Sequence, residues 1–423
     1  MEHKKEWIIY IGIAIVTVLL NVLAWNSTAF CDAYIAYVFP IWVNTYGRVT
    51  GLFSFSVGEW MIVAGIVLVV VAALLGVLAV VLKIVGLCER FVRTKNVGEN
   101  FQAGESHGVI KTGLKKIIMA YYHFFAWTLL IVCVIMTLNC SILYHASTFS
   151  QKYFGDETKE STKVDSSEYT IADVIRLYNY VAEQCNDLCQ KVERAEDGTI
   201  LYHGVNSQGE PVDMEDKAIE VMQQLGKTYG QLDGYYPRPK PMMFSDSMCQ
   251  QYMCGYYFPF SMEANYNDVM YIMNKPASMC HELAHLRGYI YEDEANFISY
   301  LACVSSDDVT FQYAGYLSVL NYLINDLYKA VQTSPEAYEK ALEEVQPISM
   351  YAIVQEDNIF VTDEEWERIN GKALLDTETV DEISDTFTDT TLKLNGVEDG
   401  MVSYSRVVRL LLQYYDYNSA LKR

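Results

Sequence analysis

MIVAGIVLVVVAALLGVLAVVL, residues 61–82, is the stretch that decides the architecture of the first third of the chain. None of its 22 residues has a polar side chain. An α-helix rises about 1.5 Å per residue, so roughly 20 apolar residues cross the hydrocarbon core of a bilayer. A soluble helix of this length has a polar face, and this stretch has none. The stretch therefore predicts a transmembrane helix.

Two further stretches have the same character. Trp7–Trp25 is apolar apart from Thr17 and Asn21, and Ile117–Leu138 is interrupted by one histidine and two threonines. Each is long enough to span a bilayer as a helix. The predicted transmembrane region is residues 1–148, with spans at about 7–25, 61–85 and 117–143.

The distribution of Lys and Arg predicts the orientation of these spans. Lys4 and Lys5 precede the first span, and the loop over 88–116 carries six basic residues, whereas the segment 26–60 carries only Arg48. We therefore expect a multi-pass membrane protein with a cytoplasmic N-terminus and an extracytoplasmic C-terminal domain. The aromatic segment 26–60 is expected in the outer interface or under the large domain. The first span also resembles a signal peptide, but Ala24-Trp25-Asn26 is a poor cleavage site, so we expect it to be retained.

The remainder of the chain has a different composition. Residues 1–143 contain ten Lys and Arg against seven Asp and Glu, whereas residues 144–423 contain 21 against 46. Phosphate binding requires clustered cations, so we expect no nucleic-acid partner. Among ten cysteines, the spacing of Cys249 and Cys254 permits a disulfide or a metal site without deciding between them. The predicted partner of the apolar spans is the lipid bilayer.

The periodicity of apolar residues after a polar linker at 150–168 predicts a mainly α, α+β extracytoplasmic domain over 149–423. A short strand is expected at 256–260. The expected helices cover residues 170–192, 213–229, 277–287, 292–304, 309–332, 335–345, 363–371, 378–394 and 403–417.

The sequence His281-Glu282-Leu283-Ala284-His285 carries the chemistry of this domain. Residues i and i+4 share one helical face, so both imidazoles can bind one Zn²⁺. Glu282 lies about 100° further around the helix, where it can act as general base toward a water molecule activated by the metal. Pro276 suits the start of this helix, and Gly288 suits the turn after its end.

A third metal ligand is expected from the acidic cluster that follows Gly288. A carboxylate is favoured over a third imidazole, which only His145 or His203 could supply outside the membrane or cytoplasm. Glu292 is the first choice and Glu294 the alternative, whereas Asn296 is expected to orient a ligand by hydrogen bonding. A continuous helix would carry Glu292 about 16 Å from His281, so the turn at Gly288 must fold it back.

These motifs resemble a bacterial membrane-protein family catalogued as domain of unknown function 3810. The family pattern places His-Glu-Leu-Ala-His, a glycine and Glu-x-Glu-Ala-Asn-Phe after three spans, as found here at 281–285, Gly288 and 292–297. An upstream pattern matches 259–265, except that Met262 stands where the pattern usually has glycine. A downstream pattern matches Leu392-Lys393, Gly400 and Ser403-Tyr404.

The resemblance implies a zincin-like metallopeptidase fold and leaves the substrate open. It suggests Phe258–Asn265 as an edge strand that aligns substrate, with Glu263 as a possible contact for a substrate amine. Tyr313 or Arg287 is the candidate for stabilising an oxyanion. The predicted function is a membrane-anchored zinc metallopeptidase that hydrolyses peptide bonds, with a peptide or protein as its substrate. The alternatives are a zinc-binding sensor without catalysis and a scaffold protein without metal.

Overall fold

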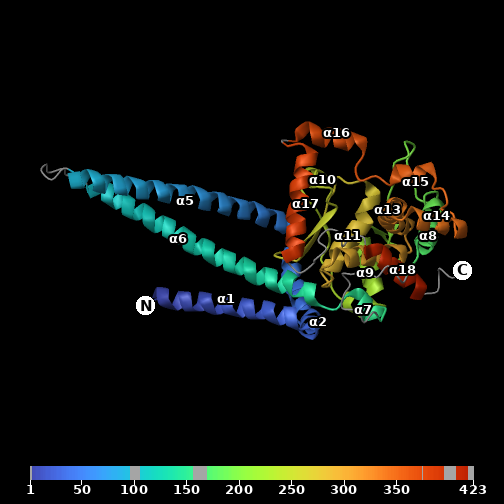
Figure 1. Cartoon of the computed structure of the whole chain (residues 1–423), viewed down its shortest axis with the longest axis horizontal. Coiled ribbons are helices and arrows are strands. Elements are labelled where there is room, and N and C mark those ends of the chain that lie inside the picture. Colours follow the sequence, from blue (N-terminus) through green and yellow to red (C-terminus); the bar gives the residue numbers. More distant parts are fainter. Residues whose placement is uncertain (1, 96–104, 156–168, 374, 395–405, 418–423) are drawn as a thin grey trace. The chain divides into compact units, whose positions relative to one another are not determined.

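A computed structural model describes residues 2–95, 105–155, 169–373, 375–394 and 406–417 (Figure 1). The described chain is mainly helical, with two small sheets. It divides into two compact units. The first comprises Met1–Val22 and Gly58–Thr137, and the second comprises Leu23–Val57 and Leu138–Arg423.

Three long helices make up the first unit: α1 (Glu2–Asn26), α5 (Val57–Lys95) and α6 (Glu105–Met136). They contain the first two predicted spans and most of the third, which continues past Met136 through a π-helical turn (Thr137–Ser141) into a 3-10 turn (Leu143–His145). The candidate spans of the structure are Lys5–Asn26, Val57–Cys88 and Thr112–His145. Each of these segments is long and apolar enough to cross a membrane. The three-span prediction is therefore confirmed at the level of helix length and composition, and it points to a membrane location.

Polar side chains within the first unit bond to one another or to the backbone. Nδ2 of Asn21 donates to Oγ1 of Thr137 at 2.8 Å. The hydroxyl of Tyr122 donates to the carbonyl oxygen of Ala72 at 2.6 Å. A Cβ atom on Gly76 would lie 2.8 Å from the same hydroxyl, so this glycine allows the close approach. Such pairing is needed where water is absent.

The second unit begins with short helices next to the spans: α2 (Thr28–Tyr37), α3 (Phe39–Trp42), a π-helical turn (Val43–Gly47) and α4 (Arg48–Thr50). Ser27 caps α2 by accepting from the backbone of Phe30. The helix α7 (Phe149–Tyr153) follows the third span and has a capping box built by Thr148 and Gln151. The structure thus assigns the segment that links the first two spans to the unit that carries the large domain.

The rest of the second unit is a helical domain whose helices follow the predicted periodicity closely. The predicted helix over 292–304 is found with the same bounds, and the one over 309–332 differs by one residue. The short α10 and α15 were not predicted. The helices are α8 (Ile171–Leu188), α9 (Met214–Gly226), α10 (Ser245–Cys249), α11 (Lys275–His285), α12 (Glu292–Val304), α13 (Val309–Thr333), α14 (Pro335–Glu344), α15 (Ala352–Asp357), α16 (Asp363–Lys372), α17 (Thr377–Leu394) and α18 (Arg406–Tyr417).

A three-stranded sheet lies beside α11, with the strand order β3 (Lys240–Pro241), β5 (Glu263–Tyr266) and β4 (Gly255–Phe258). The central β5 pairs parallel with β3 and antiparallel with β4. The expectation that Phe258–Asn265 forms the edge strand is therefore wrong, because most of that stretch is the central strand. The edge is β4. A second, two-stranded hairpin joins β1 (Gly204–Val205) to β2 (Pro211–Val212).

Met262, in the turn between β4 and β5, has a φ of 54°. This left-handed conformation favours glycine, which explains the glycine usual in the family pattern. Met262 is fully buried, and its sulfur lies 3.4 Å from the hydroxyl oxygen of Tyr257. The methionine thus makes packing contacts that a glycine lacks, in a backbone conformation that costs about 1–2 kcal/mol for an ordinary residue.

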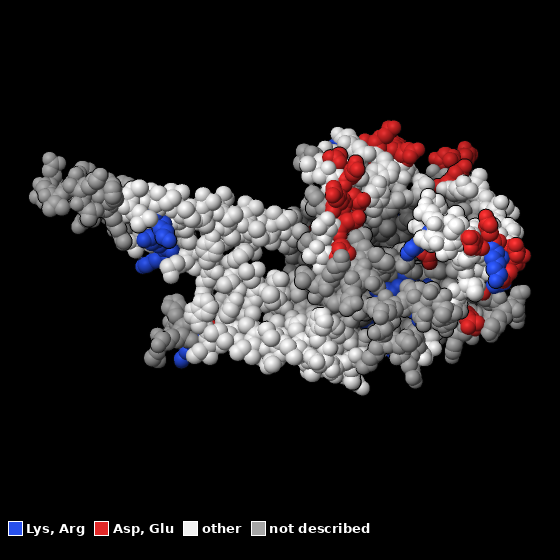
Figure 2. Space-filling model, in the orientation of Figure 1, with Lys and Arg blue, Asp and Glu red and all other residues white. Residues whose placement is uncertain are grey.

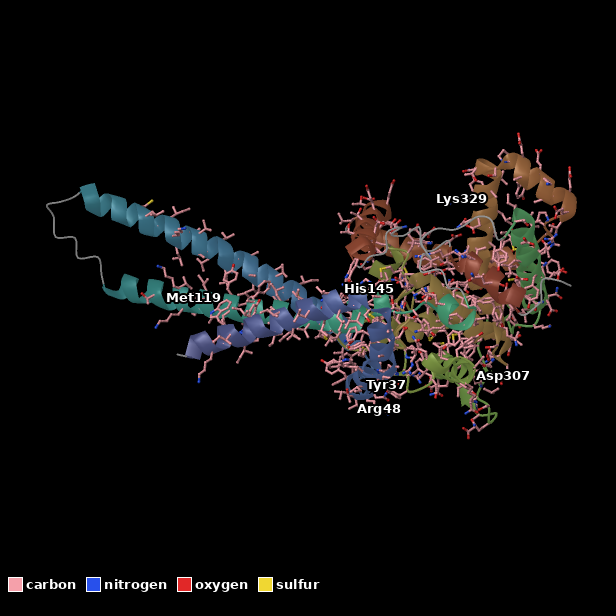
Figure 3. All side chains as sticks on the ribbon, turned by 60° about the horizontal axis from the view of Figure 1, so that its bottom comes forward. Tyr37, Arg48, Met119, His145, Asp307 and Lys329 are labelled. Atoms are coloured by element: carbon pink, nitrogen blue, oxygen red, sulfur yellow. The ribbon has the colours of Figure 1, made fainter. Side chains whose placement is uncertain are left out.

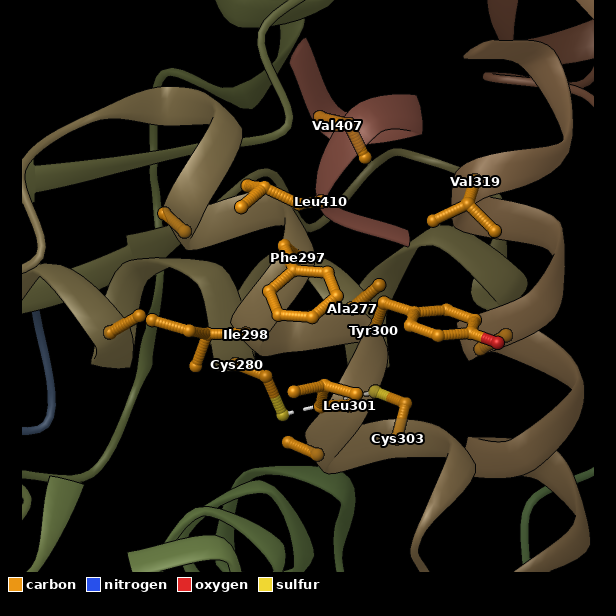
Figure 4. Close-up of a cluster of buried hydrophobic side chains, with 14 of the residues drawn as sticks. Ala277, Cys280, Phe297, Ile298, Tyr300, Leu301, Cys303, Val319, Val407 and Leu410 are labelled. Carbon is orange, nitrogen blue, oxygen red and sulfur yellow. Dashed lines mark hydrogen bonds between the residues drawn. The ribbon is translucent and has the colours of Figure 1, made fainter. Parts of the chain in front are cut away.

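The core of the domain packs α11 and α12 against α13 and α18 (Figure 4). The thiols of Cys280 and Cys303 point toward one another across α11 and α12, with 3.9 Å between the sulfur atoms. All ten cysteines are free, so the structure contains no disulfide between Cys249 and Cys254. Cys249 instead contacts the Asn267 side chain at 3.2 Å.

Acidic side chains gather on the surface of α16 and α17 (Figure 2). This placement accords with the strongly acidic composition of the domain. The downstream family pattern at Gly400 and Ser403-Tyr404, and most of the predicted linker over 150–168, lie outside the described residues.

Candidate metal centre

The helix α11 presents two histidines on one face. Pro276 lies in its first turn, where a missing backbone N–H costs nothing. His281 and His285 are one turn apart, and their Nε2 atoms are 3.0 Å apart. The imidazole rings are nearly perpendicular, with centroids 4.7 Å apart. Both Nε2 atoms thus face one point.

The turn after α11 brings a carboxylate to the same point. Gly288 has a φ of +87°, a conformation that L side chains adopt rarely. A Cβ atom on Gly288 would lie 2.9 Å from the side chain of Ile35 in α2. The chain reverses here, and α12 starts at Glu292. One oxygen of Glu292 lies 2.9 Å from Nε2 of His281, and the other lies 3.8 Å from Nε2 of His285.

Hydrogen bonds on the far side of each ring fix how the histidines are oriented. Nδ1 of His285 lies 2.7 Å from the carbonyl oxygen of Tyr289, which can only accept. Nδ1 of His281 lies 2.8 Å from Oδ1 of Asn296, whose Nδ2 donates to the hydroxyl of Tyr322 at 3.0 Å. Both Nδ1 atoms are therefore donors, which leaves the two Nε2 atoms to face the common point.

This donor set fits a divalent metal ion. His281, His285 and Glu292 each offer one ligand atom, and these atoms all lie within 4.8 Å of one another. Two imidazole lone pairs and a carboxylate oxygen at one point repel each other unless a cation or proton lies between them. His₂Glu with an open fourth position is the donor set of catalytic zinc sites, and the far-side hydrogen bonds match those that usually orient zinc ligands. The group could therefore hold a metal ion.

The electrostatics of the three groups follow from burial and from their contacts. Burial lowers the pKa of His281, but its ion pair with Glu292 outweighs this effect and raises the pKa to about 9. Burial lowers the pKa of His285 to about 4, despite the nearby charge of Glu292. Burial acts to raise the pKa of Glu292, but its bond to His281 and the charges of both histidines hold it below its usual value.

Glu282 lies beside this group in a confined position. Burial raises the pKa of its carboxyl to about 8, and the backbone of Tyr257 in β4 bonds to it. Its Oε2 is buried and has no hydrogen-bond partner among the described residues. A Cβ atom on Gly255 would lie 2.5 Å from Oε1 of Glu282, so this glycine makes room for the carboxylate. Glu282 thus has an acceptor oxygen that the protein leaves unpaired.

The comparisons with known proteins agree with the resemblance seen in the motifs. The family model "Protein of unknown function (DUF3810)" matches residues 34–412. The chain belongs to this family. No curated protein and no solved structure matches it. The match covers the three residues whose ligand atoms converge and most of the segment before the second span.

Glu294, the alternative ligand, faces elsewhere within this DUF3810 chain. Its carboxylate accepts a hydrogen bond from the backbone N–H of Phe149 at the start of α7. Burial, reinforced by the charge of Asp293, raises its pKa to about 8. The two other histidines weighed as ligands also lie apart, since His145 packs on Trp25 and His203 contacts Glu193. None of these groups is among the three whose ligand atoms converge.

The three candidates for substrate or oxyanion contact each have a structural partner. The buried hydroxyl of Tyr313 donates to Asp357 at 2.8 Å. The guanidinium of Arg287 donates to the backbone carbonyls of Gln231 and Asp233. Glu263 forms a buried ion pair with Lys240. These contacts bind parts of the second unit together.

Three parts of the site were missed by sequence reasoning. Gly255 makes room for Glu282, the Tyr289 carbonyl orients His285, and Tyr322 supports Asn296. Tyr322 is 26 residues from Asn296 on another helix, so no local pattern connects them. Only the Gly255 position carried a sequence signal, because glycine before a strand often marks a close approach.

The apparent zinc affinity of this group is expected to rise with pH. His281 has a pKa of about 9, so at neutral pH zinc must displace its proton, whereas His285, at about 4, is already neutral. The affinity should increase about tenfold per pH unit between pH 7 and 8.5 and level off above about 9. Competition titrations with a chelating dye would measure this slope. An affinity that stays constant over this range would contradict the protonated His281–Glu292 pair.

Proposed function

We propose that this protein is a membrane-anchored zinc metallopeptidase with a zincin-like catalytic domain. His281, His285 and Glu292 would hold the metal, with Glu282 as general base. The observation that carries the proposal is the buried, unpaired Oε2 of Glu282 next to the converging ligand atoms. A structural zinc site normally has four protein ligands and needs no such acceptor. This contrast favours catalysis over a binding or sensing role.

Zinc in this position would polarise the scissile carbonyl and lower the pKa of a water molecule to about 7. Glu282 would take a proton from the attacking water as the new C–O bond forms. It would then give that proton to the amine nitrogen as the C–N bond breaks. Burial raises the pKa of the Glu282 carboxyl, which strengthens its ionised form as a base and helps it to hold the proton between the two steps.

An extended peptide could align along the edge strand β4. Its partner β5 occupies one side of the strand, and Glu282 contacts the backbone of Tyr257 within it. Strand addition at a free edge is a common way to bind peptides without sequence selection. We further propose that the domain over 149–423 is extracytoplasmic, because of the basic loop between the second and third spans.

The test is metal analysis of the full-length chain in detergent or lipid, followed by incubation with a peptide library. We expect about one zinc per chain in the wild type and none in the His281→Ala/His285→Ala variant. Peptide hydrolysis should follow the zinc content. The isolated fragment 150–423 is unsuitable, because it lacks Ile35, which contacts the Gly288 turn, and Phe149, which binds Glu294. A folded wild-type chain that binds no zinc would refute the proposal.

A further inference from the structure

The segment Phe39–Phe55, called here the interface segment, is apolar on two opposite faces. One face packs on the large domain through Phe39, Val43, Gly47 and Thr50, all of them buried. The other face is exposed, with Leu52 at 83% and Ile41 and Val49 at 56% each. The exposed apolar side chains are Ile41, Trp42, Tyr46, Val49, Leu52, Phe53 and Phe55. A helical segment in water has a polar outer face, so this segment suits an apolar surrounding.

The polar side chains of the interface segment confirm this character. Nδ2 of Asn44 donates to the carbonyl oxygen of Pro40 at 2.8 Å, and Oγ1 of Thr45 donates to that of Ile41 at 2.6 Å. Each of these side chains thus directs a donor to its own helix rather than to water. Arg48 is the one charged residue of the segment, and its guanidinium lies 3.8 Å from the ring centroid of Tyr235. Figure 3 shows Tyr37 and Arg48 within the dense side chains of these short helices.

The connectivity of the chain determines what covers the exposed face. Only Ser27 separates the candidate span Lys5–Asn26 from α2, and only Ser56 separates Phe55 from the candidate span Val57–Cys88. Both ends of this part of the chain are therefore held at one membrane surface. An apolar, nearly uncharged helical surface in this position fits the boundary between lipid headgroups and acyl chains. Trp42, Tyr46 and the neighbouring Trp60 are residue types that favour this boundary.

We propose that the interface segment is inserted in the lipid interface and holds the metal centre at the bilayer surface, so that the substrates are peptide segments lying at that surface. The second part of this inference rests on the proposed peptidase function. The first part concerns the position of the segment and does not depend on catalysis.

The metal-binding group is connected to the membrane-proximal segments by single side chains. The ring of Tyr257 lies 5.7 Å from that of His285, and its hydroxyl donates to the carbonyl of Asn139 at 3.3 Å. Asn139 belongs to the last turns of the third candidate span. Next to Glu292, the hydroxyl of Tyr291 donates to the carbonyl of Tyr144 at 2.7 Å. Each connection consists of a single tyrosine side chain, so the three candidate metal ligands lie close to the end of the third candidate span.

A buried ion pair fixes the interface segment to the sheet of the site. The ammonium of Lys240 in β3 donates to the carbonyls of Thr50 and Phe55 at 2.8 and 3.1 Å, and pairs with Glu263 in β5. The hydroxyl of Thr50 also donates to the carbonyl of Ser261 at 2.8 Å. Lys240 and Glu263 are almost completely buried, so separating them from the segment would leave charges unpaired. Buried polar contacts therefore join the sheet to the segment.

The position of the segment can be tested by photolabelling. The full-length chain would be placed in phosphatidylcholine vesicles containing a phospholipid with a diazirine near the headgroup, irradiated, digested and mapped by mass spectrometry. We expect labels at Ile41, Val49, Leu52 and Phe53 besides those in the spans. Tyr328 and Tyr351 are equally exposed aromatic residues elsewhere on the same unit and should stay unlabelled. Labelled spans without labels in 39–55 would overturn the proposal.

The substrate class can be tested with one peptide mixture offered in two forms, free or coupled at one end to a phospholipid in the same vesicles. Anchored peptides should be cut about tenfold faster or more at equal bulk concentration. Their cleavage should occur within about ten residues of the lipid, roughly 35 Å of extended chain. A site on the far side of a domain of this size would instead cut only beyond about 15 residues. The Glu282→Gln variant supplies the background.

The outcomes separate this inference from the proposed function. If the segment is photolabelled but cleavage occurs only far from the anchor, the restriction to surface peptides is overturned and the peptidase proposal stands. Equal rates for free and anchored peptides would do the same. No cleavage of either form by a zinc-loaded, photolabelled chain would refute the peptidase proposal, and the substrate class with it, while the interface position would stand.

Discussion

Replacing Glu282 by glutamine is expected to abolish peptide hydrolysis while zinc binding persists. The amide has nearly the shape of the carboxylate and fits the space that Gly255 leaves. It cannot accept a proton from water at any working pH. Loss of a general base costs about 10²–10⁴ in rate, so the variant should fall to or near background. Because the three ligand groups are unchanged, its zinc content should equal that of the wild type.

The measurement pairs metal analysis with a rate assay on identical preparations. Glu336→Gln, a change of the same chemistry at an exposed position on α14, is the matched control and should leave both values unchanged. A Glu282→Gln variant that hydrolyses peptides at the wild-type rate would refute the assigned role of Glu282. A variant that loses its zinc would instead show that Glu282 contributes to metal binding.

Replacing Glu292 by glutamine is expected to weaken zinc binding more than about 100-fold. Changes in groups that merely orient a ligand already cost about 10–100-fold, and this change removes a charged ligand. It also removes the ion pair that keeps His281 protonated, so the pKa of His281 should fall below its present value of about 9. Zinc affinity, measured against a chelating dye, should therefore be both weaker and less dependent on pH.

Glu294→Gln is the matched control two residues away. Its carboxyl pKa is about 8, so the group is largely neutral near pH 7 and an amide resembles it. The amide oxygen can still accept the hydrogen bond from Phe149. We expect this variant to keep its zinc affinity within a few-fold. The reverse result, with zinc lost in Glu294→Gln and kept in Glu292→Gln, would make Glu294 the ligand.

The sequence predicted those features that depend on neighbouring residues along one helix. A run of 22 apolar residues has few alternatives to a membrane span, and the structure has three helices that are long and apolar enough to be spans. The periodicity of the apolar residues predicted α12 with the bounds that the structure shows. The i, i+4 spacing of His281 and His285 put both rings on one face, because helix geometry alone determines that direction. Gly288 marked the turn for a similarly local reason.

The tertiary structure decided what depends on residues distant in the sequence. Glu292 and Glu294 are both acidic residues in one helical turn, and only the contact with Phe149 shows that Glu294 faces away. The central position of β5 was hidden because its neighbour β3 lies more than 20 residues upstream. Short strands contain too few residues for the alternation of apolar and polar side chains to show which strand lies at the edge of the sheet.

The contacts of the segment that precedes the second span were likewise beyond sequence reasoning. Its apolar composition indicated a membrane interface or a buried surface, and the structure shows that one face is buried on the domain while the other is exposed. The sequence by itself determined the spans, the histidine pair and the turn, because their physics is local to one helix and its end. Only the folded chain brings Ile35 to Gly288 and Lys240 to Thr50, because such contacts depend on packing between elements that are far apart in the chain.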